Sequence, residues 1–451
     1  MDAEDRLRPE FVDRVLDAVE AGDDDTARAL VEPLHPADVA DLIELAARDE
    51  REGLVKALAG IVDADVLTEM NEHVREALIE ALAPEQVANL AGQMETDDAV
   101  AILEDLEEDD QQAVLRAMEP DDRAAIEEAL TYPEESAGRL MQRDLIAVPE
   151  HWKVGEVIDY LRSSDNLADD FWEVFVVSPD HHPVGTCKLS SILRSPRSSP
   201  IRSIMMEEQT LIPVDMDQED LALRFQKYAL VSAAVTDDAG RLVGMITVDD
   251  VVHIIQEEAS EDVLLLSGAG DGDINEPVTE SYLARVRWLI ANLLTALVAA
   301  SVIRFFEGSI ERLAVLAVLM PIVAGVGGNA GTQTLAVTVR ALATNQLTGS
   351  NRWRAVGREL RVAILNGLTI AVLIGVGVSI VLGSQALGMV IAVAMLINII
   401  IAGLAGVMVP LALERAGADP AVASSVFVTM VTDSMGFLAF LGLATAAGLV
   451  P

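Results

Sequence analysis

The sequence predicts a multi-domain membrane protein: an all-α superhelical N-terminal domain, a duplicated α/β region, and an all-α transmembrane domain of five helices. The chain has 451 residues with 73 acidic and 31 basic side chains. Of these, 67 acidic and 21 basic residues precede residue 282. Residues 362–413 are uncharged, a run of 52 residues where roughly 20 suffice to cross a bilayer. A wholly soluble enzyme is therefore excluded.

Residues 1–132 are predicted to form an acidic domain of short stacked helices. Apolar residues recur there at spacings of three and four, as on one face of a helix. Pro36, Pro84 and Pro120 each stand one or two residues before an acid, and proline and acids in the first turn favour a helix start. The repetition of this pattern predicts a solenoid-like arrangement.

Residues 136–256 contain an internal duplication, with copies at 136–198 and 199–256. Each copy shows the order strand, helix, strand, strand, helix, with a glycine shortly before the last helix, Gly185 in one and Gly244 in the other. Alternating apolar residues mark the strands. The duplication resembles a tandem pair of CBS domains, which are regulatory modules rather than catalysts.

A connecting helix is predicted within residues 248–276, followed by the membrane domain at 282–451. Spans are expected near 287–306, 313–341, 361–383, 386–413 and 421–449. With the N-terminal domains in the cytoplasm, the cytoplasmic flanks of the spans hold eight Arg residues and the outer loops two, in agreement with the positive-inside rule. This orientation in a cell membrane places the C-terminus outside.

The second predicted span carries small residues and amides on one helical face. Gly325, Gly328 and Asn329 follow each other at helical spacing, and Thr332 and Gln333 continue the same face. Such a face either packs tightly against another helix or exposes its backbone to a water-filled cavity. The proline and glycines around it favour a polar path.

The fifth predicted span contains Asp433, the one ionisable residue well inside a predicted hydrocarbon stretch. Burying an aspartate at the centre of a span costs roughly 2.5–3.5 kcal/mol, so a compensating interaction is expected. Ser425 and Thr429 precede Asp433 at intervals of four, which places two hydroxyls and a carboxylate on one face. The alternatives are a protonated carboxyl within the bundle and a path for cations or protons.

Oxygen ligands without His or Cys favour hard cations such as Mg²⁺. Nucleic acid is an unfavourable partner, because an acidic soluble part repels phosphates. Part of the acidic excess has a simpler explanation, since a Lys-poor, acidic surface also suits a cytoplasm of high salt. Cys187 is the single cysteine, so no intramolecular disulfide forms.

The domain order, the glycine-rich segment 321–333 and the motif Thr432, Asp433, Ser434, Met435, Gly436 resemble the MgtE family of Mg²⁺ channels and transporters. The resemblance covers nearly the whole chain. It implies a homodimer in a lipid membrane, with a pore between the second and fifth spans of both subunits. The resemblance implies an ion site at Asp433, where the family often has Asn and Ala in place of Ser425 and Thr429. Together with the polar faces of the two spans, it gives as expected pore residues Asp433, Thr429, Ser425, Asn329, Gly325 and Gly328.

The resemblance also implies that cytosolic Mg²⁺, held between acids of the helical domain, the CBS pair and the connecting helix, closes the pore. The matching positions are Asp97, Asp250, Glu258, Glu261, Asp262 and Asp419. The physical basis is that apposed carboxylates repel each other unless a divalent cation lies between them. His253 stands where the family pattern has an acid, which predicts a weaker regulatory affinity or other acids in its place.

Thr247 and Asp250 are similar to the residues that hold ribose and phosphate in nucleotide-binding CBS pairs. This implies ATP as a ligand, whereas a structural alternative has Thr247 as a helix cap. The sequence as a whole favours a non-enzymatic Mg²⁺ channel for magnesium uptake. Its alternatives are a cation-coupled exchanger and a membrane-anchored nucleotide sensor.

Overall fold

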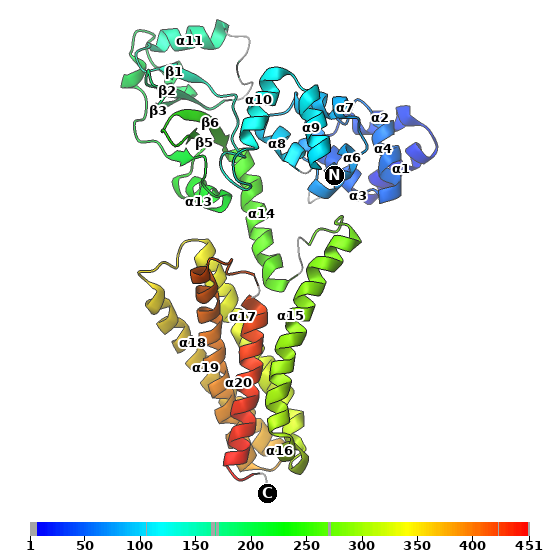
Figure 1. The fold of residues 1–451 in the computed structure, drawn as a ribbon, viewed down its shortest axis with the longest axis vertical. Helices are drawn as coiled ribbons and strands as arrows, with labels where there is room; N and C mark the ends of the chain where they lie inside the picture. Colours follow the sequence, from blue (N-terminus) through cyan, green and yellow to red (C-terminus); the bar gives the residue numbers. More distant parts are fainter. Residues whose placement is uncertain are drawn as a thin grey trace. The chain divides into compact units, whose positions relative to one another are not determined.

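The computed structural model describes residues 7–104, 106–163, 167, 171–268, 272–422 and 424–449, without the side chains of Asp262 and Ser424. The chain divides into two compact units, Met1–Gln256 and Glu257–Pro451 (Figure 1). The two are described separately below.

The described part of the first unit begins with ten short helices, and the prediction of short helices in this region is confirmed. Their starts are set locally: Asp23 and Asn71 cap helices with side-chain oxygens, and Pro36 and Pro84 occupy first-turn positions where no intrahelical N–H is needed. The helices are α1 Pro9–Glu20, α2 Asp24–Val31, α3 Pro36–Leu45, α4 Arg48–Ala57, α5 Ala64–Thr68, α6 Glu72–Ile79, α7 Pro84–Ala91, α8 Thr96–Glu104, α9 Glu108–Ala117 and α10 Pro120–Ala129.

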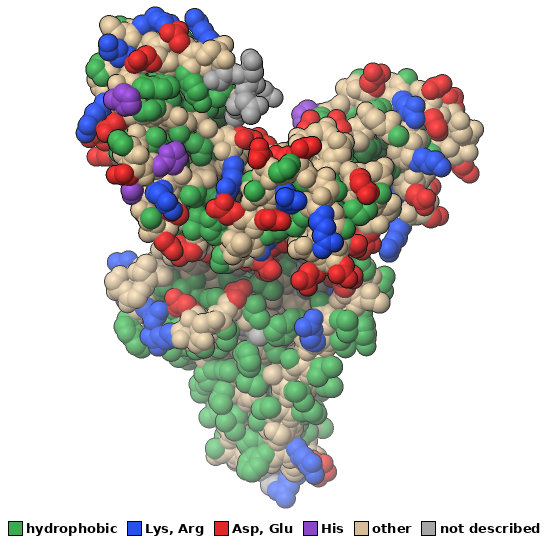
Figure 2. All heavy atoms as spheres, turned by 45° about the horizontal axis from the view of Figure 1, so that its top comes forward, with side chains coloured by type: hydrophobic (Ala, Val, Ile, Leu, Met, Phe, Trp, Pro, Cys, Tyr) green, Lys and Arg blue, Asp and Glu red, His purple; other side chains and the backbone are tan. Residues whose placement is uncertain are grey.

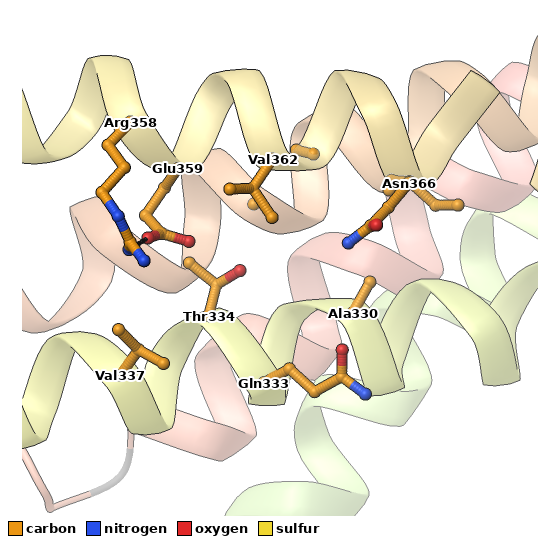
Figure 3. Close-up of a pocket in the computed structure, with 11 residues that line it drawn as sticks. Ala330, Gln333, Thr334, Val337, Arg358, Glu359, Val362 and Asn366 are labelled. Atoms are coloured by element: carbon orange, nitrogen blue, oxygen red, sulfur yellow. Dashed lines mark hydrogen bonds and ion pairs between the residues drawn. The ribbon is translucent and has the colours of Figure 1, made fainter. Parts of the chain in front are cut away.

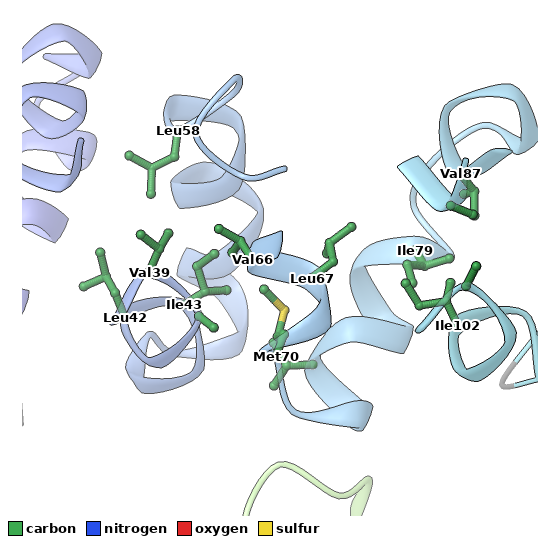
Figure 4. Packing of buried hydrophobic residues seen from close by; sticks show 14 of the residues in the cluster. Val39, Leu42, Ile43, Leu58, Val66, Leu67, Met70, Ile79, Val87 and Ile102 are labelled. Carbon is green, nitrogen blue, oxygen red and sulfur yellow. The ribbon is translucent and has the colours of Figure 1, made fainter. Parts of the chain in front are cut away.

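One apolar core runs through these helices. Leu42 and Ile43 of α3, Leu67 of α5 and Ile102 of α8 are at most 3% exposed and belong to it (Figure 4). Because each helix is too short to be stable alone in water, the domain depends on burying these faces against neighbouring helices. This packing fixes the first turn of α8, which carries part of the site described below.

The duplicated region forms two three-stranded sheets in the described residues. In each sheet the first strand is parallel to the second, which is antiparallel to the third. The expected order of elements in both copies is confirmed. The first copy has β1 Ala147–Pro149, α11 Val154–Ser163, β2 Glu173–Val177, β3 Pro183–Lys188 and α12 Leu189–Arg194; the second has β4 Leu211–Pro213, α13 Gln218–Tyr228, β5 Ser232–Thr236, β6 Leu242–Thr247 and α14 Val248–Ser267.

The two copies are joined by an exchange of backbone segments. Gln142, which precedes β1, forms a pair of backbone hydrogen bonds with Met245 of β6, and Met206, which precedes β4, forms the equivalent pair with Thr186 of β3. The glycines of β3 and β6 allow this approach: a Cβ at Gly244 would lie 2.9 Å from Gln142 O, and one at Gly185 would lie 2.7 Å from Met206 O. Each copy therefore completes the other.

The second unit contains the membrane helices. Within the described residues, five helices are long and apolar enough to cross a membrane, and hydrophobic side chains dominate their surface (Figure 2). The unit begins within α14. Its further helices are α15 Val278–Phe305, the short α16 Glu307–Arg312, α17 Val315–Ala343, α18 Arg352–Val381, α19 Gln385–Ala416 and α20 Ser424–Ala446. The third crossing begins at Arg352 rather than near residue 361, so its charged first turns are helical.

Small residues bring three of these helices close to α19. A Cβ at Gly406 of α19 would lie 2.7 Å from Gly331 O of α17, and one at Gly403 would lie 2.7 Å from Ala363 Cβ of α18. A Cβ at Gly436 of α20 would lie 2.7 Å from Asn398 Nδ2 of α19. The fourth crossing is accordingly the most buried one, and α17, α18 and α20 are arranged around it.

Candidate functional site

Three carboxylates meet in the first unit: Glu95 just before α8, Asp97 in its first turn, and Asp250 in the first turn of α14. One oxygen from each lies within 4.8 Å of the others. We call these three residues the acidic cluster. It joins the helical domain to the second CBS copy within a single compact unit.

Side chains around the acidic cluster hold two of the carboxylates. Gln142 Nε2 donates hydrogen bonds to Glu95 Oε2 and, over 3.1 Å, to Asp250 Oδ2. Thr247 Oγ1 donates to the same Asp250 oxygen over 2.8 Å. Thr247 directly precedes α14, and its hydrogen bond orients Asp250 toward the cluster. Its roles as a helix cap and as a nucleotide ligand stay predictions.

Burial and mutual repulsion raise the pKa values of the acidic cluster. Burial is the main cause in all three residues, followed by the charge of Asp250 for Glu95 and Asp97. The pKa of Glu95 rises to about 7 and that of Asp250 to about 6. The pKa of Asp97 is raised well above its ordinary value. The carboxylates therefore hold protons more readily than ordinary acids at neutral pH.

The acidic cluster fits a divalent cation on chemical and geometric grounds. Asp97 is 8% exposed, and its Oδ1 is a buried atom without a hydrogen-bond partner in the described part of the chain. A buried polar atom of this kind requires an explanation such as an ion or a water. Carboxylate oxygens are the ligands of Mg²⁺ and Ca²⁺, and a cation between them would remove the repulsion that raises their pKa values.

Two of the six predicted regulatory residues, Asp97 and Asp250, thus lie together in the acidic cluster. Glu258 and Glu261 lie on α14, partly buried and exposed respectively, and the side chain of Asp262 is outside the described residues. Asp419 is exposed, and its Oδ1 accepts a hydrogen bond from Ala421 N before α20. The roles of these four residues stay predictions. Glu95 and Gln142 were missed, because neither shows a recognisable spacing from the other members.

The polar face predicted in the second crossing is distinct from its packing face. Val323, Gly327 and Gly331 of α17 are buried, and a Cβ at Gly331 would lie 2.6 Å from Val428 Cγ1 of α20. In contrast, Gly325 and Asn329 are exposed, and Gly328 is partly so. Among the described residues outside the adjacent backbone of α17, no atom lies within 4 Å of a Cβ placed at either glycine. Tight packing therefore uses one set of glycines, and the described part of the chain leaves the polar set uncovered.

Asp433 lies on α20 next to the helix that carries this polar face. Its neighbour Thr432 is buried, with its methyl group 3.3 Å from a Cβ placed at Gly331. Asp433 itself is partly exposed. Thr429 Oγ1 donates to Ser425 O over 2.8 Å, so the Thr429 hydroxyl is held along α20 and keeps its lone pairs for another partner. Asp433 is thus neither sealed in dry packing nor remote from α17.

The fold defines a multi-pass membrane protein that carries a duplicated α/β module and a helical N-terminal domain. The comparisons agree: residues 320–443 match the divalent cation transporter family MgtE, 34–135 the MgtE intracellular N domain, and 201–257 the CBS domain. The magnesium transporter MgtE of Bacillus subtilis is 30% identical over 78% of this chain and 79% of its own length. The chain belongs to the MgtE family of magnesium transporters.

Two further proteins are similar to this chain. The magnesium transporter MgtE of Thermus thermophilus is 32% identical over 69% of this chain and 70% of its own. A solved structure, the cytosolic domain of the Mg²⁺ channel MgtE in complex with ATP, is 26% identical with a TM-score of 0.50. It covers 54% of this chain and 99% of that one. The second similarity supports the fold of the first unit.

Proposed function

We propose that this chain carries Mg²⁺ across a cell membrane as a homodimer, along a polar path between α17 and α20 of both subunits. The observation that carries the proposal is the position of Asp433, a carboxylate beside a glycine-rich helix whose polar face the described residues of its own chain leave uncovered. A second copy would supply the opposite wall. Ser425, Thr429, Gly325, Gly328 and Asn329 would line this path.

Asp433 would act by electrostatic attraction rather than by covalent chemistry. Mg²⁺ loses its water reluctantly and is commonly held through one or two carboxylates with several waters retained. One Asp433 from each subunit, with nearby hydroxyls and backbone oxygens, suits that requirement. Entry of two positive charges through 100 mV releases about 4.6 kcal/mol, so a channel needs no further energy source.

The acidic cluster would sense the transported ion on the cytosolic side. Mg²⁺ bound by Glu95, Asp97 and Asp250 would hold the helical domain against the second CBS copy and favour the closed pore. Loss of the ion would leave three repelling carboxylates and loosen this contact. Glu258, Glu261, Asp262 and Asp419 would contribute further regulatory ligands, and ATP would bind the CBS pair near Thr247 and Asp250. This arrangement requires the N-terminal unit inside the cell and the C-terminus outside.

Mg²⁺ flux into liposomes containing the purified full chain tests the transport proposal. Asp433→Asn and Asp433→Ala should abolish most of the flux, whereas Glu307→Gln, an exposed carboxylate on α16, serves as the matched control. Undiminished flux in both Asp433 variants would rule out its assigned role. Flux that requires a proton gradient would indicate an exchanger, and no flux in the unaltered chain would indicate an anchored sensor.

A further inference from the structure

A cavity of about 220 Å³ lies between α17 and α18, with α19 beside it (Figure 3). Both α17 and α18 pack closely on small residues of α19, at Gly406 and Gly403, and the cavity lies between them. Ala330, Val362 and Ala363 form part of its apolar wall. Its polar residues are Gln333, Thr334, Arg358, Glu359 and Asn366.

Glu359 is the unusual member of this lining. Its side chain is 10% exposed, whereas that of the neighbouring Arg358, which donates a hydrogen bond to Glu359 Oε1, is 68% exposed. Figure 3 shows the side chains of Glu359, Thr334 and Asn366 directed into the space between the two helices. Within the described part of the chain, neither the Thr334 hydroxyl nor the Asn366 amide forms a side-chain hydrogen bond. A buried carboxylate and two neutral polar groups therefore face one cavity.

We propose that this cavity is a second binding site for a hydrated divalent cation, with the Glu359 carboxylate, the Thr334 hydroxyl and the Asn366 carbonyl oxygen around the ion. A water occupies about 30 Å³ in the liquid, so the cavity accommodates a cation with several waters retained, as Mg²⁺ prefers. The inference rests on the proposed function, because the ion is the transported one.

In this proposal the Arg358 side chain competes with the metal ion for the Glu359 carboxylate. Its guanidinium neutralises Glu359 when no metal is bound, and its exposed position allows it to swing into solvent when a cation enters. Because the exchange replaces one charge partner by another, the carboxylate is never left buried and unpaired, which would be strongly unfavourable. The ion would therefore be held weakly enough to leave, as conduction requires.

The cavity lies close to the proposed path and toward one membrane surface. Gln333 lines the cavity and also lies on the uncovered polar face of α17. At 1.5 Å per residue, Glu359 lies about 10 Å along α18 from its first residue. Arginines flank this end of the bundle, so the positive-inside rule assigns it to the cytoplasm. The cavity would hold the ion near the exit of the path.

Binding of Mn²⁺ to the full chain in detergent tests the proposal, with free Mn²⁺ quantified by electron paramagnetic resonance. Glu359→Gln should lower the number of bound ions by one per chain. Thr334→Val should weaken that same site. Arg358→Gln should tighten it a few-fold, since a partly exposed ion pair is worth roughly 0.2–1 kcal/mol. The control is Arg354→Gln, one helical turn before Arg358 and outside the lining of the cavity. It should change neither the number of bound Mn²⁺ ions nor their affinity.

The outcomes separate this inference from the transport proposal. An unchanged ion count in Glu359→Gln overturns the second site even if Asp433→Asn abolishes flux. Unchanged Mn²⁺ affinity in Arg358→Gln also overturns it. An increased Mn²⁺ affinity in this variant supports the site, because misfolding would not tighten binding. An aminophospholipid that co-purifies with the unaltered chain and is lost in Glu359→Gln would assign the cavity to a lipid headgroup instead. Conversely, the loss of one bound Mn²⁺ in Glu359→Gln supports the cavity site. If Asp433→Asn then shows normal flux, only the proposed path is refuted.

Discussion

Asn398 Nδ2 donates a hydrogen bond to the backbone oxygen of Val323 over 2.9 Å and so ties α19 to α17. Asn398 is fully buried, and its Oδ1 has no partner among the described residues. The same side chain occupies the positions that a Cβ at Gly327 or Gly436 would need. One amide thus sets the distance of both α17 and α20 from α19.

Gly327→Ala should therefore abolish most Mg²⁺ flux, because its Cβ overlaps Asn398 Nδ2 and must push α17 away. Asn398→Ala in the same chain removes the overlapping atom and should restore a large part of the flux. Liposome uptake of the single and double variants measures this. Gly377→Ala is the control, since its Cβ would meet no atom within 4 Å. A double variant no better than Gly327→Ala would contradict the steric explanation.

Asp97→Asn should make the metal-free first unit more stable and insensitive to Mg²⁺. The substitution removes the cost of ionising a buried carboxyl beside Glu95 and Asp250, while the ligand set for a divalent ion is lost. An increase of about 1 kcal/mol corresponds to roughly 2–4 °C in the unfolding midpoint of a unit this size. Thermal unfolding of the full chain with and without Mg²⁺ checks the result. Asp121→Asn, exposed on α10, should retain the Mg²⁺ response, and a retained response in Asp97→Asn would refute the prediction.

The effect of Mg²⁺ on the first unit should grow with pH. The folded pKa values of Glu95 and Asp250, about 7 and about 6, exceed those of ordinary acids. Protons therefore stabilise the metal-free fold at low pH, and this contribution is lost as pH rises through 6 and 7. Mg²⁺ must displace those protons, so it should protect residues 95–104 from hydrogen exchange more strongly at pH 8 than at pH 5.5. Greater protection at pH 5.5 would contradict the assignment.

Gly244→Ala and Gly185→Ala form a matched pair. Each Cβ would approach the backbone oxygen of the segment from the other copy to within 3 Å, and overpacking of this kind costs about 1–3 kcal/mol. Only Gly244→Ala displaces Gln142, whose side chain joins Glu95 to Asp250. Both variants should lower the unfolding midpoint, but only Gly244→Ala should weaken Mg²⁺ protection of the acidic cluster. Equal weakening in both would show that Gln142 has no particular role.

The sequence predicts the helices and both α/β copies because their signals are local: helical spacing, capping residues and repeated strand patterns. The polar face of α17 follows from the same periodicity, whereas the place of Asp433 beside α17 was expected only from the resemblance to the MgtE family. The acidic cluster is different, because Glu95, Gln142 and Asp250 come together only through the packing of α8 against the duplicated region. Glu359 was overlooked because the charged start of α18 resembles a loop until the helix is seen to begin at Arg352.

The backbone exchange between the two CBS copies limits how the chain can be shortened. A fragment that ends after the first copy would leave the outer edge of β3 without Met206, and a fragment that starts at the second would leave β6 without Gln142. Unpaired strand edges invite association with other chains. Single-copy fragments are therefore expected to aggregate, and workable truncations should keep Gln142 and β6 in one polypeptide.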